Sequence, residues 1–272
     1  MMFFLILLLV LIVLYLMLVA PRMFHRADRR PFIGNVFYAH RGLFDNESDA
    51  PENSLAAFKK AVDAGYGMEV DVQMTKDEQL VVFHDATLKR MCGIEGNVWD
   101  YTLEELQTFH LKDSKETIPS FAEVLNLVDG KVPLIVEYKM DRSLTKVCVL
   151  GNELLSQYHG VYCIESFHPF ALMWYRKHRP DVMRGQLSGN MANATQNPKL
   201  KMVYTLVTYL LTNVLTRPDF IAYDHRYLEN ISRKFCKWLG ALSVAYTIKS
   251  AERYGEVRND FDLFIFDSCR LK

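Results

Sequence analysis

The sequence predicts an α/β fold, a parallel (β/α)₈ (TIM) barrel that follows an N-terminal transmembrane helix. Three observations support this prediction. Strand-like runs alternate with helix-like patterns from residue 36 onward, as is typical of parallel sheets. Once one hairpin strand is set aside, eight strands remain over about 240 residues, which is the count and length of such a barrel. The first 21 residues carry no charged side chain.

The first element is an apolar helix. Residues 3–20 read FFLILLLVLIVLYLMLVA, and a helix of that length crosses a hydrocarbon core of ~30 Å. A cleaved signal peptide would begin with a basic region and end in a small-x-small cleavage site, whereas the start MMFF has no basic side chain. We therefore expect a single-pass anchor over residues 1–21 that contacts the lipid bilayer through residues 3–20.

A basic segment follows the anchor at residues 22–33. Four arginines with a histidine between them lie here: Arg22, His25, Arg26, Arg29 and Arg30. No positive residue precedes the apolar run, so the positive-inside bias places the carboxyl side of the span in the cytoplasm. We expect one barrel domain over residues 34–272, on the cytoplasmic side of the membrane.

Strand-like runs follow along the rest of the chain. They lie at 36–39, 68–73, 80–83, 132–139, 161–167, 182–187, 220–224, 242–248 and 263–267. Residues 75–79 are too few for a crossover, so the run at 80–83 is predicted to form an antiparallel hairpin. In the run at 68–73, alternation sends Glu69, Asp71 and Gln73 to one face. In a barrel this acidic face looks into the mouth, and the apolar face lies under the helices.

Helix starts are marked by capping residues between these strands. Asn53 or Ser54 is expected to cap a helix that ends at Gly65. The S/T-x-x-E spacing of a capping box recurs at residues 102–105 and 120–123 and predicts two more helix starts.

Titratable side chains gather at the predicted carboxyl ends of the strands. They are His40, Arg41, Glu69, Asp71, His84, Glu137 and Lys139. Three carboxylates that converge on one mouth repel one another unless a cation lies among them, and oxygen ligands favour Mg²⁺, Ca²⁺ or Mn²⁺ over zinc. The two histidines exchange protons near neutral pH, and the arginine and lysine can hold a phosphoryl oxygen. These residue types predict displacement at phosphorus.

Composition excludes several other classes of protein. The 32 basic and 32 acidic residues give zero formal charge, so there is no general field that would gather nucleic acid, and we expect no nucleic-acid partner. The five cysteines never form a C-x-x-C pair, which argues against a zinc ribbon and a disulfide framework. Free thiols are expected instead.

The sequence resembles the glycerophosphodiester phosphodiesterases. The matching segments, in order, are AHRG at 39–42, PENS at 51–54, MEVDVQMTKDEQLVVFHDATLKR at 68–90, TLEEL at 102–106, IPSFAEVL at 118–125, EYK at 137–139 and SF at 166–167. The resemblance implies metal ligation by Glu69, Asp71 and Glu137, acid–base catalysis by His40 and His84, and phosphate contacts from Arg41 and Lys139. It also implies a glycerophosphodiester or lysophospholipid substrate and a divalent cation as cofactor.

The late part of the chain departs from the family pattern. Where the family usually shows S-F-D, this sequence has Ser166, Phe167 and His168. Its W-T-x-N and T-D-x-P motifs are replaced by YTIK at 246–249 and FDSC at 266–269. His168 either replaces a polar substrate contact or begins the following helix before Pro169.

Two hypotheses follow from these patterns. The first is a membrane-anchored, metal-dependent phosphodiesterase that acts on glycerophosphodiesters, lysophospholipids or a glycerol-phosphate polymer. The second is a non-catalytic barrel that binds such headgroups as a membrane scaffold. The intact early motifs favour the first. A phospholipase C proper is a third interpretation, weakened because no accessory lipid-binding domain fits in the chain.

One further apolar stretch lies at residues 200–215, LKMVYTLVTYLLTNVL. Its apolar positions follow helical spacing, which predicts a helix with one strongly apolar side. Such a helix either packs on the outside of the barrel or rims the mouth, dips into the bilayer and accepts an acyl chain of the substrate.

Overall fold

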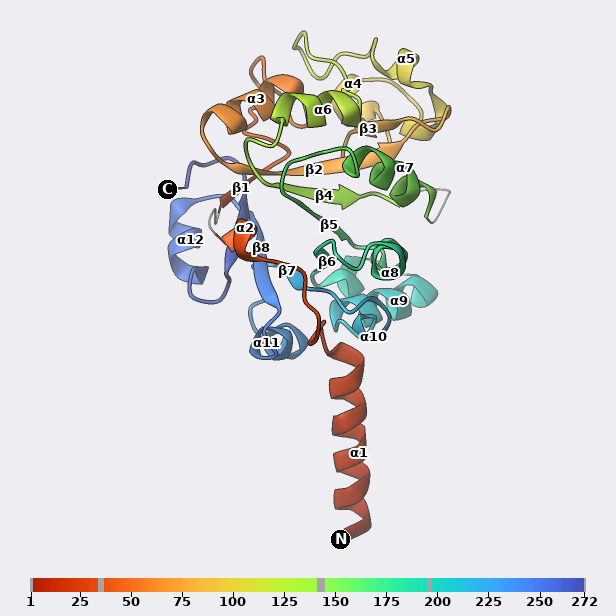
Figure 1. Ribbon diagram of the computed structural model, residues 1–272, viewed down its shortest axis with the longest axis vertical. Coiled ribbons are helices and arrows are strands. Elements are labelled where there is room, and N and C mark those ends of the chain that lie inside the picture. Colours follow the sequence, from red (N-terminus) through yellow and green to blue (C-terminus); the bar gives the residue numbers. More distant parts are fainter. Residues whose placement is uncertain (1, 34–36, 141–144, 195–196, 272) are drawn as a thin grey trace.

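The computed structural model describes residues 2–33, 37–140, 145–194 and 197–271. Its strands follow the order β1-β9-β8-β7-β6-β5-β4-β2-β3, and β1 also pairs with β2, so all of them except β3 close into a barrel (Figure 1). Pairings within the barrel are parallel, whereas β3 runs antiparallel to β2. The predicted TIM barrel and the predicted hairpin are both confirmed.

Each described strand lies within two residues of its predicted limits. The strands are β1 Phe37–His40, β2 Gly67–Met74, β3 Leu80–Val82, β4 Leu134–Tyr138, β5 Tyr162–Ser166, β6 Arg184–Ser188, β7 Phe220–Asp224, β8 Leu242–Ile248 and β9 Leu263–Phe266. The first residue of the first predicted run, Val36, lies outside the described residues.

Most of the longer helices cover the outside of the barrel, whereas α1 projects away from it and α4 and α5 belong to a lobe beside it. The helices and short turns are as follows. They are α1 Met2–Val19, α2 Arg30–Ile33, α3 Leu55–Asp63, α4 Lys89–Cys92, α5 Leu103–Leu106, α6 Phe121–Val128, α7 Lys146–Leu155, α8 Pro169–His178, α9 Pro198–Thr208, α10 Asn213–Thr216, α11 Ile231–Trp238 and α12 Ala251–Val257, with short 3₁₀ turns η1 Val98–Asp100 and η2 Met191–Ala194. Ser54, rather than Asn53, caps α3 by accepting a hydrogen bond from the backbone of Ala57. Both predicted capping boxes form, at the starts of α5 and α6.

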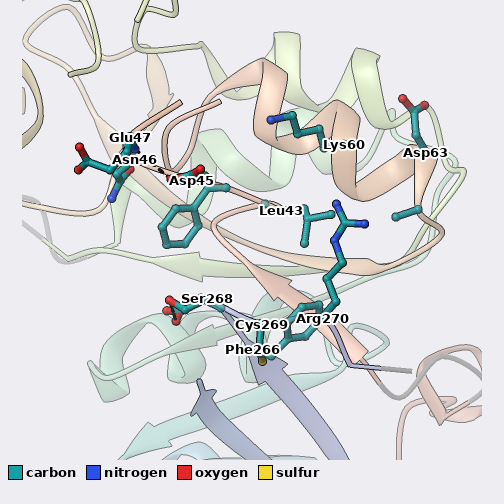
Figure 2. Close-up of a pocket in the computed structure, with 14 residues that line it drawn as sticks. Leu43, Asp45, Asn46, Glu47, Lys60, Asp63, Phe266, Ser268, Cys269 and Arg270 are labelled. Carbon is teal, nitrogen blue, oxygen red and sulfur yellow. Dashed lines mark hydrogen bonds between the residues drawn. The ribbon is translucent and has the colours of Figure 1, made fainter. Parts of the chain in front are cut away.

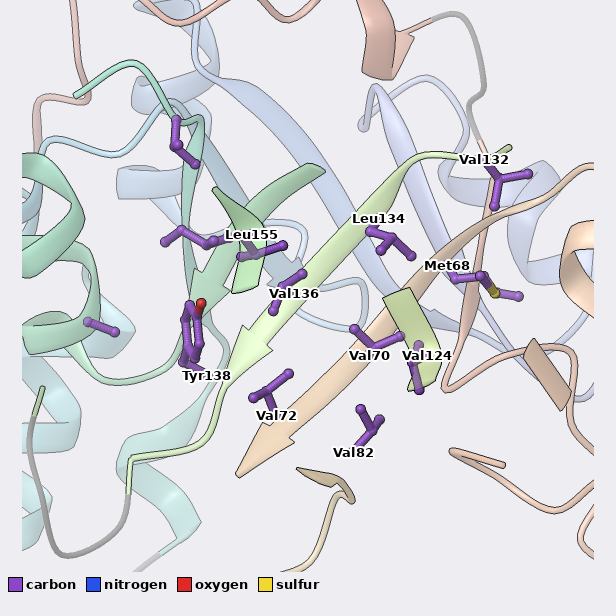
Figure 3. Packing of buried hydrophobic residues seen from close by; sticks show 14 of the residues in the cluster. Met68, Val70, Val72, Val82, Val124, Val132, Leu134, Val136, Tyr138 and Leu155 are labelled. Carbon is purple, nitrogen blue, oxygen red and sulfur yellow. The ribbon is translucent and has the colours of Figure 1, made fainter. Parts of the chain in front are cut away.

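The alternation in β2 divides its side chains between two environments. Val70 and Val72 point outward and pack with Val136 of β4 and with the covering helices (Figure 3). Each fully buried valine contributes about 1.5–3 kcal/mol of hydrophobic stabilisation relative to an exposed one. The acidic residues between them therefore face the barrel interior, where they form the site described below.

Residues 80–118 form a small lobe beside the barrel. Its core contains Val81, Phe83, Leu88, Met91, Val98, Leu106, Leu111 and Ile118, and this cluster is separate from the cluster between the sheet and the outer helices. The lobe begins with the hairpin strand β3, whose last residues lead directly to His84.

All five cysteines of the chain are free, as expected.

The segment that links α1 to the barrel lies against the amino ends of the strands. Arg26 donates hydrogen bonds to the carbonyls of Leu239 and Gly240, just before β8. Phe32 is 3% exposed and packs into the apolar interior of the barrel, where its carbonyl accepts a hydrogen bond from the Tyr38 hydroxyl. The basic segment therefore closes the end of the barrel opposite the site.

Helix α1 projects away from the barrel. It has 18 residues with a mean hydropathy of 3.3 and is long and apolar enough to cross a membrane by length and composition. Its end is held by hydrogen bonds from Asn213 to the carbonyl of Val19 and from Arg217 to the carbonyl of Ala20. In Figure 1, α1 runs vertically away from the barrel, and α9, α10 and α11 lie at the end of the barrel domain nearest to α1.

The apolar stretch at 200–215 differs from the single helix that its spacing predicts. Helix α9 ends at Thr208 and α10 begins at Asn213. Between them Leu210 is fully buried with a left-handed backbone (φ 56°), a conformation that is unfavourable for a branched residue. Burial of this side chain in the core outweighs that strain and breaks the helix.

Candidate active site

Parallel pairing brings the predicted acidic residues into one layer inside the barrel. Glu69 lies opposite His40 of β1, and Asp71 lies opposite Glu137 of β4. Glu137 in turn lies opposite Glu165 of β5. Because side chains alternate along each strand, residues in register on neighbouring strands point to the same side. These five side chains therefore line the interior near the carboxyl ends of the strands.

Three carboxylates form a compact buried cluster. Glu69, Asp71 and Glu137 each offer an oxygen, and these oxygens lie within 4.8 Å of one another. The Lys139 ammonium lies 2.9 Å from Asp71 Oδ1 and 2.6 Å from Glu137 Oε1. Glu69 Oε1 is buried without a hydrogen-bond partner. A buried all-oxygen donor set with an unpartnered atom fits a hard divalent cation.

The electrostatics of this cluster are strongly perturbed. Burial raises the pKa of Glu69 well above its usual range, and the charges of Asp71 and Glu137 raise it further. Burial also raises the pKa of Glu137 to about 7, although Lys139 opposes the shift. For Asp71 the positive charges of Lys139 and Arg41 outweigh burial and hold the pKa below its usual value. The raised pKa values of Glu69 and Glu137 indicate that Lys139 and Arg41 do not fully offset the mutual repulsion of three ionised carboxylates.

Arg41 is aimed at the cluster by an unusual backbone conformation. It has a φ of 58°, and its N–H bonds to Glu69 Oε2. Its guanidinium donates to Glu52 Oε1 at 2.7 Å and lies 3.4 Å from Asp71 Oδ2. Gly42 follows with a φ of 83°, where a Cβ atom would lie 2.9 Å from the backbone of Ala57. Left-handed backbone at non-glycine residues is often found at functional sites.

Two acidic side chains orient the histidines. His40 Nδ1 lies 3.1 Å from Asp267 Oδ2, and His84 Nδ1 lies 2.7 Å from Asp85 Oδ1. Burial lowers the pKa of both imidazoles, and Asp267 partly opposes this at His40. Both histidines are therefore mainly neutral near pH 7, and each keeps its Nε2 for a second partner. Such an arrangement suits general acid–base chemistry.

Comparison with known proteins now identifies the family. The sequence profile of the "Glycerophosphoryl diester phosphodiesterase family" matches residues 40–226. The chain belongs to this family. All seven residues to which the resemblance assigns a role lie near the carboxyl ends of the strands.

Relatives of this family member include bacterial and mammalian enzymes. A glycerophosphodiester phosphodiesterase of Bacillus altitudinis is 32% identical over 157 residues, covering 53% of this chain and 63% of that protein. A lysophospholipase D of Mus musculus is 33% identical over 157 residues, covering 53% of this chain and 48% of its own length. The chain thus spans less than two thirds of the length of these relatives.

Solved structures share the fold of this family member. A phosphodiesterase of Oleispira antarctica in complex with the product sn-glycerol-3-phosphate superposes with a TM-score of 0.69 at 22% identity, covering 85% of this chain and 92% of that one. A glycerophosphodiester phosphodiesterase of Thermotoga maritima gives a TM-score of 0.66 at 24% identity, with coverage of 86% and 95%. At these identities the likeness establishes the barrel fold.

Two site residues of this family member were missed by sequence reasoning. Asp267 follows β9 directly and orients His40, although the motif around it departs from the family pattern. Glu165 is 1% exposed beside Glu137, and burial raises its pKa well above the usual range. Alternation along their strands was the available signal, because both follow apolar inward-facing residues, Ile265 and Cys163.

His168 begins the helix α8, which is one of the two roles that the sequence left open. Its Nδ1 accepts a hydrogen bond from the Phe170 backbone and so caps α8. Its side chain also lines a cavity that adjoins His84 and Lys139. The helix start therefore places an imidazole in the wall of the mouth.

The cavities at this end of the barrel differ in character. A small one of about 150 Å³ lies among His40, Glu69, His84 and Glu137, at the centre of the predicted site. A larger one of about 940 Å³ lies between α3 and the segment after β9, and Figure 2 shows it lined by polar residues such as Lys60 and Arg270. The larger cavity contains none of the seven predicted site residues, so size alone does not locate the chemistry.

Proposed function

We propose that this family member is a metal-dependent phosphodiesterase that hydrolyses glycerophosphodiesters or lysophospholipids. The products would be an alcohol together with a glycerol phosphate or a lysophosphatidate. The proposal rests on one observation: three buried carboxylates converge beside two histidines that are each oriented by an acidic side chain. Membership of the family and the relative named as a lysophospholipase D support it.

Glu69, Asp71 and Glu137 are the residues that would hold a divalent cation, Mg²⁺ or Ca²⁺ or alternatively Mn²⁺. The unpartnered oxygen of Glu69 supports this assignment, as does the mutual repulsion of the carboxylates, which raises the pKa of Glu69. When bound, the ion supplies positive charge that offsets the phosphate charge during displacement.

The side chains around the cluster supply the rest of the chemistry. Arg41 and Lys139 bind the phosphoryl oxygens, since both cations already lie at the mouth beside Asp71. One of the pair His40 and His84 accepts the proton of the attacking hydroxyl, and the other protonates the departing alcohol. The histidine that acts as the base must be neutral, as both are at rest, and the histidine that acts as the acid must first take up a proton from solvent.

Hydrolysis of defined diesters tests the proposal. The full chain, purified in detergent, is incubated with glycerophosphocholine, glycerophosphoethanolamine and a lysophosphatidylcholine, each with Mg²⁺, Ca²⁺ or excess chelator. We expect metal-dependent release of the free alcohol, abolished in Glu69→Ala and retained in Glu104→Ala, which changes an exposed carboxylate on α5. Metal-dependent binding without release would favour the scaffold alternative, and full turnover in chelator would overturn the metal assignment.

We also propose that α1 anchors the protein in the membrane with the barrel on the cytoplasmic side. The apolar helix and the basic residues after it support this orientation. Replacing the arginines is a poor test, because Arg22, Arg26 and Arg29 also bond to barrel carbonyls. A better test is to add protease to intact cells and to lysed cells. The barrel should resist digestion only in intact cells. Digestion of the barrel in intact cells would contradict the orientation.

A further inference from the structure

An apolar cavity adjoins the proposed site on one side. It has a volume of about 510 Å³, within the range of small-molecule pockets. At one end it is lined by His84, Glu137 and Lys139, and at the other by Val203 and Val207 of α9. The cavity therefore runs from the charged site to the inner side of an outer helix.

The walls between these ends are largely apolar. Trp99 comes from the lobe that carries His84, Phe170 from the start of α8, and Met191 from the turn before α9. A water-soluble headgroup gains little from such walls, whereas each buried methylene of a hydrocarbon chain gains hydrophobic free energy. The lining thus favours a substrate whose phosphate is followed by an aliphatic chain.

The outer side of α9 is apolar as well. Met202 is 66% exposed and Leu206 is 40% exposed, and Trp238 of α11 is 77% exposed. These helices lie on the flank of the barrel from which α1 projects (Figure 1). Exposed apolar side chains gathered beside a membrane-spanning helix are suited to lie in the lipid interface. A source of hydrocarbon chains would then lie directly beside the helix that lines the cavity.

We propose that this cavity receives the acyl chain of a single-chain glycerophosphodiester lipid, which reaches it from the bilayer along α9 while its phosphate occupies the site. This inference rests on the proposed phosphodiester hydrolysis and names the substrate class of that same site. The two ends of the cavity match the two ends of such a lipid, a charged phosphodiester and an aliphatic chain.

A series of acyl-chain lengths tests the inference. Wild-type protein in detergent is given glycerophosphocholine and lysophosphatidylcholines with six, eight and ten acyl carbons, all as dispersed monomers. We expect kcat/KM to rise with chain length, by up to roughly fourfold for each fully buried methylene. Val203→Asp, at a half-exposed position that lines the cavity, should flatten this dependence. The matched Val149→Asp, on the exposed face of α7, should keep it.

A second comparison tests the route from the bilayer. Leu206 is exposed on α9 and does not line the cavity. Leu206→Asp should slow hydrolysis of lysophosphatidylcholine in phosphatidylcholine vesicles more than hydrolysis of the dispersed eight-carbon lipid. Equal effects on both would overturn the bilayer route.

The outcomes separate this inference from the proposed function. Hydrolysis of glycerophosphocholine with no rise along the chain series overturns the acyl site alone. So does a Val203→Asp variant that loses the same factor on every substrate and melts at a lower temperature, because α9 would then be only a packing element. Failure of the wild-type protein to hydrolyse any of these diesters with Mg²⁺, Ca²⁺ or Mn²⁺ overturns the proposed function and this inference together.

Discussion

Replacing Glu69 by glutamine should stabilise the metal-free protein while it removes metal binding. Glu69, Asp71 and Glu137 repel one another, because their oxygens lie within 4.8 Å. At that separation two unit charges interact by about 3 kcal/mol at an effective dielectric constant of about 20. Lys139 and Arg41 offset part of this repulsion. We therefore expect Glu69→Gln to gain about 2 kcal/mol at pH 8, or roughly 4–8 °C in melting temperature.

The pH dependence of this gain follows from the pKa of Glu69. Burial raises that pKa well above its usual range, so the folded protein binds a proton there that the unfolded chain has released. Metal-free stability then falls as the pH rises above the usual range of a glutamate. The advantage of Glu69→Gln should accordingly be largest at pH 8 and shrink toward pH 4, where the carboxyl is protonated in both states.

Thermal unfolding of the full chain in detergent measures these effects. In chelator, Glu69→Gln should melt above wild type, and Glu104→Gln, at an exposed site, should match wild type. Added Mg²⁺ or Ca²⁺ should raise the melting temperature of wild type by mass action and of Glu69→Gln much less. The reasoning is refuted if Glu69→Gln melts below wild type in chelator and responds to metal as wild type does.

Three further outcomes are expected. His40→Ala and His84→Ala should each lower kcat on glycerophosphocholine by at least about 10²-fold. The double variant should lose less than the product of the two single losses. If either single variant keeps near-normal rates from pH 5 to 9, the histidine it lacks is structural. Burial lowers the pKa of His40 and Asp267 opposes that shift, so Asp267→Asn should lower this pKa further. One side of the pH profile of kcat/KM should then move to lower pH, and an unchanged profile contradicts the role of Asp267. Arg90 and Arg41 outweigh burial and lower the pKa of Glu52 to about 2, so the stability that ionised Glu52 contributes is lost as the pH falls from about 4.3 toward 2. In urea unfolding, Glu52→Gln should therefore lose less stability than wild type over this pH range. An equal loss in both proteins would contradict the ion pairs of Glu52 with Arg41 and Arg90.

The sequence was sufficient to predict the barrel because its strands are short and clearly bounded. In β2, the alternation of Glu69 and Asp71 with valines predicted both the outer core and the acidic layer inside. Neighbouring strands then placed Glu137 in the same layer through register alone. At these positions the local sequence pattern agrees with the fold, so the acidic layer on β2 and β4 could be predicted.

Features that depend on contacts between distant segments could not be predicted from the local sequence. Leu210 fits a helical pattern, yet its complete burial holds it in a left-handed turn that ends α9. Asp267 orients a histidine 227 residues earlier in the chain. Alternation along β9 places Asp267 inside the barrel, but its pairing with His40 depends on how the closed barrel brings β1 and β9 together. The helix break depends instead on the burial of Leu210 in the core.

The two histidines belong to separately packed parts of the molecule. His40 ends a strand of the barrel, whereas His84 is carried by the lobe of residues 80–118, which has its own apolar core. The distance between them therefore depends on how the lobe docks. The pairing of β3 with β2 holds the lobe to the barrel, and Gln73 adds hydrogen bonds to the carbonyls of Phe83 and Asp85. Substitutions inside the lobe, such as at Met91 or Leu106, should therefore lower the proposed activity while the barrel stays folded. The rate of the proposed reaction is then set partly by apolar residues that lie away from the charged side chains of the site.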